Sequence, residues 1–261
     1  MRIVVTGASG FIGRALMDVL PLASHEAVPK LRDAQALVHL AAIAHRRGVD
    51  ERELRRVNVG LAVDAGRSAA AAGVPMLFMS SVKVHGEESD TPLRETSPIA
   101  PRDAYARSKA QAEEALRAIP GLRLTVLRPP LVYGPAVKAN FLALMRAIAR
   151  GMPLPLAAIE NRRSLVYVGN LCDAILACLG SAGKTYLVSD GAPVSTPQLC
   201  RAIGAALGRP ARLFPVPWLP GKALTASLEV DDRAIRAELG WKPRFSFEDG
   251  LRLTAAWYRN R

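Results

Sequence analysis

Short apolar segments alternate with longer amphipathic segments along the first half of the chain. The apolar segments are rich in aliphatic and β-branched residues and are bounded by glycine, proline or polar residues, which is typical of buried strands. They predict strands at 2–6, 36–41, 75–80 and 122–127. Apolar residues recur at helical spacing between them, which predicts helices at 11–20, 51–73 and 104–118. This alternation favours an α/β fold with a parallel, doubly wound sheet.

The pattern changes after about residue 130, where helical segments are separated by proline-rich loops. The predicted helices of this half are 139–150, 170–180, 196–207, 231–239 and 248–259. We interpret it as a smaller, mixed lobe. No apolar run approaches the roughly 18 residues needed to cross a bilayer. No signal peptide precedes the first strand, so we expect a cytoplasmic protein without a membrane partner.

Composition adds a strong positive charge to this picture. The chain has 261 residues, half of them hydrophobic, and a net charge of +12. That charge suits anionic ligands such as dinucleotides or sugar nucleotides, and it would also suit nucleic acid. The plainer interpretation is that arginine-rich helices within 46–72 carry solvated side chains. No basic run is interleaved with aromatic residues, so we expect no specific nucleic-acid partner.

The cysteines and histidines give no sign of a metal site. Cys172, Cys178 and Cys200 match no metal-binding spacing, and the four histidines are scattered. We therefore predict that the thiols are small core residues and that no metal is bound.

A glycine triplet follows the first strand. Gly7 would permit a tight turn, Gly10 would let the backbone approach a pyrophosphate, and Gly13 would let the helix lie against the strand. The positive end of the helix would then face the phosphates. Because the triplet lies between a strand and an apolar helix, it predicts a dinucleotide site. A tight turn without a ligand is the alternative.

Two further motifs carry acid–base chemistry. Tyr105 and Lys109 are four residues apart and share one face of a helix. A nearby ammonium favours a phenolate, so we expect Lys109 to lower the pKa of Tyr105 and make it a general acid or base near neutral pH. Ser81 follows the strand at 75–80, at the end where open α/β sheets hold ligands. The alternatives are that Tyr105 and Lys109 are a surface pair on a helix and that Ser81 is a turn serine.

In this order, the motifs resemble the extended short-chain dehydrogenase/reductase family, which includes nucleotide-sugar epimerases, dehydratases and ketoreductases. The matching segments are TGASGFIG at 6–13, VHLAA at 38–42, the helix with Asn58, SSVKVHG at 80–86, YARSK at 105–109, LRPPLVYGP at 127–135, NRRSLVYVGNL at 161–171 and LGWKP at 239–243. The resemblance covers nearly the whole chain. It is strongest toward enzymes of O-antigen synthesis that resemble UDP-glucose 4-epimerase or reduce UDP-4-keto-6-deoxy-N-acetylhexosamines.

The resemblance implies roles for individual residues. Tyr105 would be the acid/base, Lys109 would hold the ribose and tune Tyr105, and Ser81 would orient the sugar. The residues implied to contact NAD or NADP are Gly7, Gly10, Phe11, Ile12, Gly13, Leu40, Ala41, Ala42, Asn58, Tyr105 and Lys109, with Arg32 as a further candidate. The residues implied to contact a UDP-sugar are Ser81, Val82, Lys83, Lys138, Asn140 and Arg163.

It also implies an organisation. Residues 1–135, with parts of 160–180, would form a Rossmann-like dinucleotide-binding domain, and 136–261 would be mainly a substrate-binding lobe. A homodimer through 51–73 and 104–118 is a family expectation.

Two departures from the family pattern change the expected function. Sugar 4,6-dehydratases carry Asp-Glu after the strand-end Ser or Thr, where this chain has Val82 and Lys83. Lysine cannot replace a carboxylate that protonates a leaving hydroxyl, so a 4-epimerase or 4-ketoreductase acting at C4 of a UDP-hexose is expected instead. A non-catalytic nucleotide-binding or regulatory member is the alternative.

The second departure is a shortened segment after Gly13. Only 22 residues separate it from the strand at 36–41, too few for the strands and helix that normally precede that strand. One short strand at 26–31 is expected, and the sheet should lack at least one strand and one helix at this edge. Its end carries Lys30 and Arg32 instead of the acidic residue that binds ribose. Either the adenosine is held loosely, or one of these cations contacts a 2′-phosphate and NADP is preferred.

Overall fold

Six parallel strands form the main sheet of the computed structural model, which describes residues 2–20, 24–25, 31–44, 48, 50–181, 183–216 and 225–261. Their order across the sheet is β2-β1-β3-β4-β5-β8, and every adjacent pair is parallel. The strands are β1 (Ile3–Thr6), β2 (Ser24–His25), β3 (Ala36–His39), β4 (Met76–Met79), β5 (Leu124–Arg128) and β8 (Thr185–Leu187). The expected doubly wound parallel sheet is confirmed.

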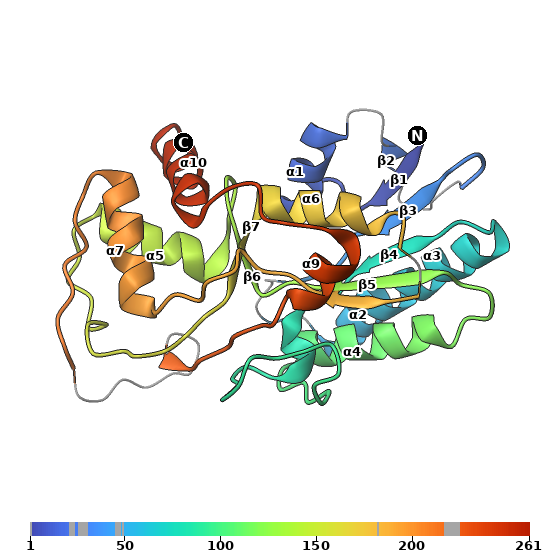
Figure 1. Ribbon diagram of the computed structural model, residues 1–261, viewed down its shortest axis with the longest axis horizontal. Coiled ribbons are helices and arrows are strands. Elements are labelled where there is room, and N and C mark those ends of the chain that lie inside the picture. Colours follow the sequence, from blue (N-terminus) through green and yellow to red (C-terminus); the bar gives the residue numbers. More distant parts are fainter. Residues whose placement is uncertain are drawn as a thin grey trace.

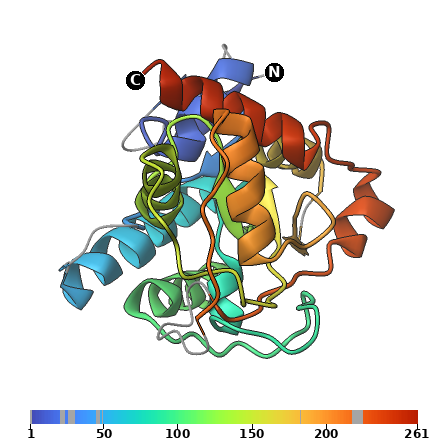
Figure 2. The ribbon, with the colours of Figure 1, turned by 90° about the vertical axis from the view of Figure 1, so that its left-hand side faces the viewer.

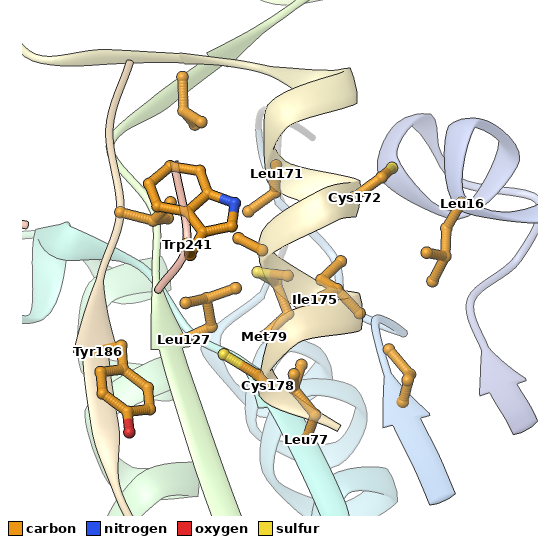
Figure 3. Packing of buried hydrophobic residues seen from close by; sticks show 14 of the residues in the cluster. Leu16, Leu77, Met79, Leu127, Leu171, Cys172, Ile175, Cys178, Tyr186 and Trp241 are labelled. Atoms are coloured by element: carbon orange, nitrogen blue, oxygen red, sulfur yellow. The ribbon is translucent and has the colours of Figure 1, made fainter. Parts of the chain in front are cut away.

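Helices cover the two faces of this sheet (Figure 1). One layer holds α1 (Phe11–Val19) and α6 (Val168–Cys178), and the other holds α3 (Leu61–Ala71) and α4 (Ala104–Arg117). Figure 3 shows the first layer, with α6 lying over Leu77 and Met79 of β4 and Cys172 directed toward Leu16 of α1.

The other layer packs small residues of α3 and α4, among them Ala62 and Ala112, against Phe78 and Val126 of the sheet. Cys172, Cys178 and Cys200 are buried free thiols, as predicted.

The remaining elements form a second cluster beside the carboxyl ends of the strands (Figures 1 and 2). A two-stranded parallel sheet of β6 (Leu131–Tyr133) and β7 (Leu165–Tyr167) leads into it. Around it lie α5 (Ala139–Ala149), α7 (Thr196–Leu207) and α10 (Phe247–Arg259), with α9 (Arg233–Leu239) next to β8. Their core is centred on Tyr133, which stacks on Phe141 with ring centroids 5.5 Å apart.

The shortened edge and the second half differ in detail from the sequence pattern. The edge strand β2 lies at 24–25, not 26–31, and residues 26–30 lie outside the described part of the chain. Of the described residues, none forms a strand beyond β2. The pattern did not predict β6, β7 or β8, and β8 brings a segment from the second half into the main sheet.

The long helix predicted at 51–73 is a continuous run of α2 (Glu51–Leu54), a π-helical stretch η1 (Arg55–Gly60) and α3. A short 3₁₀ turn, η2 (Val82–His85), follows β4 within the predicted loop. In the described ranges, no helix has the length and apolar character of a membrane span.

Candidate functional site

The predicted motifs converge at the carboxyl ends of β1, β3 and β4. Gly7 follows β1, Leu40 follows β3, and Ser81 lies two residues after β4. Because these three strands are parallel neighbours in the sheet, their ends meet at one edge. Residues more than 70 positions apart in sequence, from Gly7 to Ser81, therefore surround one space.

The glycine turn is pressed closely against its neighbours. Gly7 has φ +74°, and a Cβ built there would lie 2.6 Å from the Ala41 backbone nitrogen. A Cβ on Gly13 would lie 2.3 Å from the Gly7 carbonyl oxygen. Both positions therefore require glycine. Gly10 caps α1 without a side-chain hydrogen bond, so the first N–H groups of this nine-residue helix can meet an anion.

Asn58 connects the segment after β3 to α4. It lies in the π-helical stretch η1, a type of distortion often found at functional sites. Its Oδ1 accepts from Ile43 N at 2.8 Å, and its Nδ2 donates to Ile43 O at 3.1 Å and to Ser108 Oγ at 2.9 Å. Ser108 donates in turn to the Tyr105 carbonyl at 2.7 Å. Asn58 thus braces the chain after β3, at Ile43, against the helix that carries Tyr105.

Three successive residues at the end of β4 each meet a different residue on one stripe of α4. Lys109 Nζ donates to the Met79 carbonyl at 2.7 Å. Ser80 Oγ donates to Glu113 Oε1 at 2.5 Å. The Ser81 hydroxyl hydrogen-bonds to the side chain of Tyr105. The structure therefore brings the predicted set of Ser81, Tyr105 and Lys109 together.

Burial dominates the electrostatics of this set. It lowers the pKa of Lys109 to about 7, and the Glu113 carboxylate opposes that shift. It also lowers the pKa of His39 to about 3, helped by the charge of Lys109. His39, at the end of β3, is 1% exposed and shares a 2.9 Å hydrogen bond with Thr6 Oγ1.

The expectation that Lys109 lowers the pKa of Tyr105 is wrong for this structure. Burial raises the pKa of Tyr105, and the Asp103 carboxylate raises it further, while the hydrogen bond from Ser81 opposes both. The ammonium of Lys109 is directed to the Met79 carbonyl and lies 4.6 Å from the centre of the Phe78 ring.

Glu113 belongs to a buried network of ionic contacts that the sequence did not predict. Arg128, the last residue of β5, donates to both Glu113 oxygens, with Nε–Oε1 at 2.9 Å and Nη2–Oε2 at 2.5 Å. Arg128 Nη1 also meets His85 Nε2 at 3.0 Å. A signal was present, because Glu113 follows Lys109 by four residues and so continues its helix face.

Two predicted substrate residues lie in unexpected surroundings. Val82 is 3% exposed and packs against Leu187, Leu228 and Val230, so the expectation that its side chain lines the substrate site is corrected. Lys83 Nζ lies 2.6 Å from Asp103 Oδ2 and 3.2 Å from Glu87 Oε1.

Asp103 was also missed, although an aspartate just before a predicted helix is a recognisable cap signal. It caps α4 by accepting from Ala106 N at 2.6 Å.

The predicted diphosphate residues lie in the second cluster. Lys138 caps α5, Asn140 lies in its first turn, and both are exposed. Arg163 is half-buried and donates to the Ala226 carbonyl at 2.9 Å; burial lowers its pKa, and the Glu87 carboxylate opposes this. The hydrogen bond ties Arg163 to Ala226 and does not join it to Asn140.

Arg32 lies in the segment before β3, with 94% of its side chain exposed and its Nε 3.9 Å from Asp33 Oδ2. Lys30, the other candidate for a 2′-phosphate, lies outside the described residues. Over the described ranges, no cluster of three His, Cys, Asp or Glu side chains could hold a metal ion.

Comparison with known proteins places this arrangement among sugar-nucleotide enzymes. A family model described as the NAD dependent epimerase/dehydratase family matches residues 22–188. The UDP-glucose 4-epimerase of Vibrio cholerae is 35% identical over 308 aligned positions, which cover 97% of this chain and 94% of the relative. The alignment is longer than the 261-residue chain, so the relative holds residues that this chain lacks.

Solved structures agree with this placement. The UDP-glucose 4-epimerase of Thermus thermophilus, in complex with NAD, superposes with a TM-score of 0.81 at 25% identity and 99% coverage of both chains. The dTDP-glucose 4,6-dehydratase of Streptomyces venezuelae, with NAD bound, superposes with a TM-score of 0.85 at 25% identity, covering 100% of this chain and 98% of the other. The chain belongs to the NAD dependent epimerase/dehydratase family.

Proposed function

We propose that the chain is an NAD(P)-dependent epimerase or ketoreductase that acts at C4 of a UDP-hexose. The observation that carries the proposal is the meeting of Ser81, Tyr105 and Lys109 at the end of β4, next to the glycine turn. The similarity to the Vibrio UDP-glucose 4-epimerase supports the choice of substrate. Val82 and Lys83 replace the acidic pair that a 4,6-dehydratase needs.

The residues present fit a dinucleotide. The glycine turn has the required close approaches, and its helix N-terminus is open to a pyrophosphate. Gly7, Gly10 and Gly13 would hold the phosphates, with Phe11 and Ile12 beside them, and Leu40–Ala42 would line the adjacent wall. When bound, the cofactor would supply the hydride acceptor and donor for C4.

The residues of the chain would then manage the proton and the sugar. Tyr105 takes the proton from the C4 hydroxyl and returns it later, while the Ser81 hydroxyl orients the sugar oxygen. Lys109 holds a ribose hydroxyl near Tyr105. Arg163 and Asn140, with Lys138, hold the diphosphate, where the guanidinium fork suits phosphate oxygens. Residues 1–135 with parts of 160–180 would bind the dinucleotide, and 136–261 would mainly bind the substrate.

Turnover with defined sugars tests this proposal. With catalytic NAD, an epimerase interconverts UDP-glucose and UDP-galactose without net reduction of the cofactor, which nuclear magnetic resonance can follow. A reductase instead oxidises NAD(P)H in proportion to a UDP-4-keto-6-deoxyhexose. Tyr105→Phe should abolish either reaction while changing UDP-sugar affinity by only a few-fold, and full activity of this variant would exclude the assigned role.

Calorimetric titration with NAD and NADP separates the remaining possibilities. Heat with NADP alone would support a cationic adenosine site, whereas weak heat with both would support loosely held adenosine. No heat with either, together with no turnover, would favour the non-catalytic alternative. We also propose a homodimer through residues 51–73 and 104–118, where Leu61 is 39% exposed.

A further inference from the structure

A second lysine lies beside the acid–base set, on the turn that begins with Ser81. Ser81 caps the 3₁₀ turn η2 by accepting from Lys83 N at 3.3 Å. From this turn, Lys83 reaches Asp103 with its Nζ 2.6 Å from Oδ2. The other oxygen of Asp103 accepts from Ala106 N and so caps α4, in which Tyr105 is the second residue. One ion pair thus joins the two segments that present Ser81 and Tyr105.

The same ion pair governs the charge next to Tyr105. The Asp103 carboxylate raises the pKa of Tyr105, because a negative charge opposes formation of a phenolate. The hydrogen bond and the charge of Lys83 lower the pKa of Asp103 against burial, and Asp103 in turn raises the pKa of Lys83 against burial. Both groups are therefore charged at neutral pH, and the Lys83 ammonium faces the carboxylate that acts on Tyr105.

We propose that Lys83 is a positioning residue for Tyr105: its ammonium balances the Asp103 carboxylate and ties the Ser81 turn to the start of α4. The inference rests on the proposed function. Lys83 is already held by two carboxylates, so it is a poor site for a further anion such as a sugar carboxylate. Its position after Ser81, where a dehydratase carries an acid, makes the chemistry of this turn different from that of a dehydratase.

Other charged and polar groups lie around this pair and enter any titration. The Ser81 hydroxyl bonds to Tyr105, and the Glu87 carboxylate bonds to Lys83. The charge of Arg107 acts on Asp103, and the charge of Glu87 acts on Arg163. Lys109 lies farther along α4. Of these and the pair itself, only Asp103 and Ser81 act on Tyr105 directly. The pair of Lys83 and Asp103 is therefore the place where one substitution changes the charge felt by Tyr105.

The test is a set of three variants read by the titration of Tyr105. Lys83→Met should raise the pKa of Tyr105 by about one unit, since a balanced charge becomes unbalanced. Asp103→Asn keeps a good helix cap and should lower the pKa of Tyr105. The double variant should return it to the wild-type value or below. Lys83→Arg should keep the wild-type value. Lys184→Met is the matched control, because Lys184 forms an ion pair of the same 2.6 Å length with Glu238, away from the site.

Two readouts keep this test separate from the proposed function. The first is the tyrosinate absorbance of the NAD-saturated protein, with the spectrum of Tyr105→Phe subtracted. This measurement needs no turnover. Without NAD, the variants should show the same order of Tyr105 pKa values, shifted to higher pH. The second is the pH profile of kcat/KM, in which the limb assigned to Tyr105 should move with the same order and neutral-pH activity of Lys83→Met should fall about tenfold.

Identical Tyr105 titrations in the wild type and Lys83→Met would overturn the proposal. A double variant as impaired as Lys83→Met would also overturn it, because it would assign Lys83 to substrate binding or to folding alone. If Lys83→Met does not fold, Asp103→Asn still decides, since an unchanged Tyr105 titration in that variant refutes the charge balance. Absent turnover with the expected order of titrations would reject only the proposed reaction.

Discussion

Replacing Lys109 by methionine should abolish turnover and yet make the protein more stable near neutral pH. Lys109 is 2% exposed, and burial lowers its pKa from 10.5 to about 7. With about 1.4 kcal/mol per pKa unit, the buried amine costs the folded state about 4 kcal/mol near pH 7. Methionine removes that cost but leaves the Met79 carbonyl without its 2.7 Å donor, a loss of about 1–3 kcal/mol. The expected net gain is about 2 kcal/mol.

The sign of the pH dependence follows from the lowered pKa. Below the folded pKa, both the folded and the unfolded protein carry the proton, and the full cost is present. As the pH rises from about 7 toward 10.5, the folded protein releases a proton that the unfolded chain keeps, so the wild type gains stability. Between about pH 7 and pH 9 this gain amounts to about 2 kcal/mol, whereas Lys109→Met lacks it. The difference in free energy of unfolding between Lys109→Met and the wild type should therefore shrink toward zero as the pH rises toward 9.

Urea unfolding of both proteins, followed by tryptophan fluorescence, measures this difference. Trp241 is 5% exposed in the core beside α6, so its emission should report unfolding. Burial raises the pKa of Cys172 and of Cys178 to about 12, which affects stability at alkaline pH. That contribution is common to the wild type and the variant, so subtraction removes it.

Lys184→Met is the control, because the side chain of Lys184 is 55% exposed and its removal should change stability by less than about 1 kcal/mol at either pH. Lower stability of Lys109→Met than of the wild type near pH 7 would refute the reasoning. So would an advantage that stays constant as the pH rises.

Two further predictions concern the cofactor side of the site. Gly13→Ala should lower NAD affinity at least tenfold in calorimetry and lower the melting temperature, because the new Cβ would lie 2.3 Å from the Gly7 carbonyl oxygen and the turn must shift. Asn58→Leu should cost about 2 kcal/mol in urea unfolding, because it removes the two hydrogen bonds to Ile43 and the one to Ser108. Its turnover at saturating substrate should fall by more than the small increase in the unfolded fraction accounts for, since Asn58 braces the helix of Tyr105. A loss of turnover no larger than that unfolded fraction would contradict this role.

The first half of the fold could be predicted because its strands are buried on both faces. Each of β1, β3, β4 and β5 is therefore buried along its whole length and mostly apolar, which makes it stand out from its polar boundaries. By contrast, β6, β7 and β8 have three residues each, and these segments are too short to show a pattern of their own. Their pairing partners lie far away in the sequence, so tertiary contacts decide them.

The site divides in a similar way. The convergence of Ser81, Tyr105 and Lys109 could be predicted because each belongs to a local motif. The error at Val82 arose because its hydrophobic cluster is built from Leu187, Leu228 and Val230, which no local pattern connects to it. The ion pair between Lys83 and Asp103 likewise spans a loop of 20 residues whose path only the structure reveals. The direction of the Tyr105 pKa shift is set first by burial and then by the Asp103 carboxylate, and no local pattern reveals either.

The alignment of β4 with α4 explains why these local motifs work together. Tyr105, Lys109 and Glu113 are spaced by four residues and lie on one face of α4. Lys109 meets the Met79 carbonyl, Glu113 meets the Ser80 hydroxyl, and Tyr105 meets the Ser81 hydroxyl. A one-residue shift of the strand end would misplace all three contacts at once. The acid–base chemistry therefore depends on the register between the end of β4 and α4.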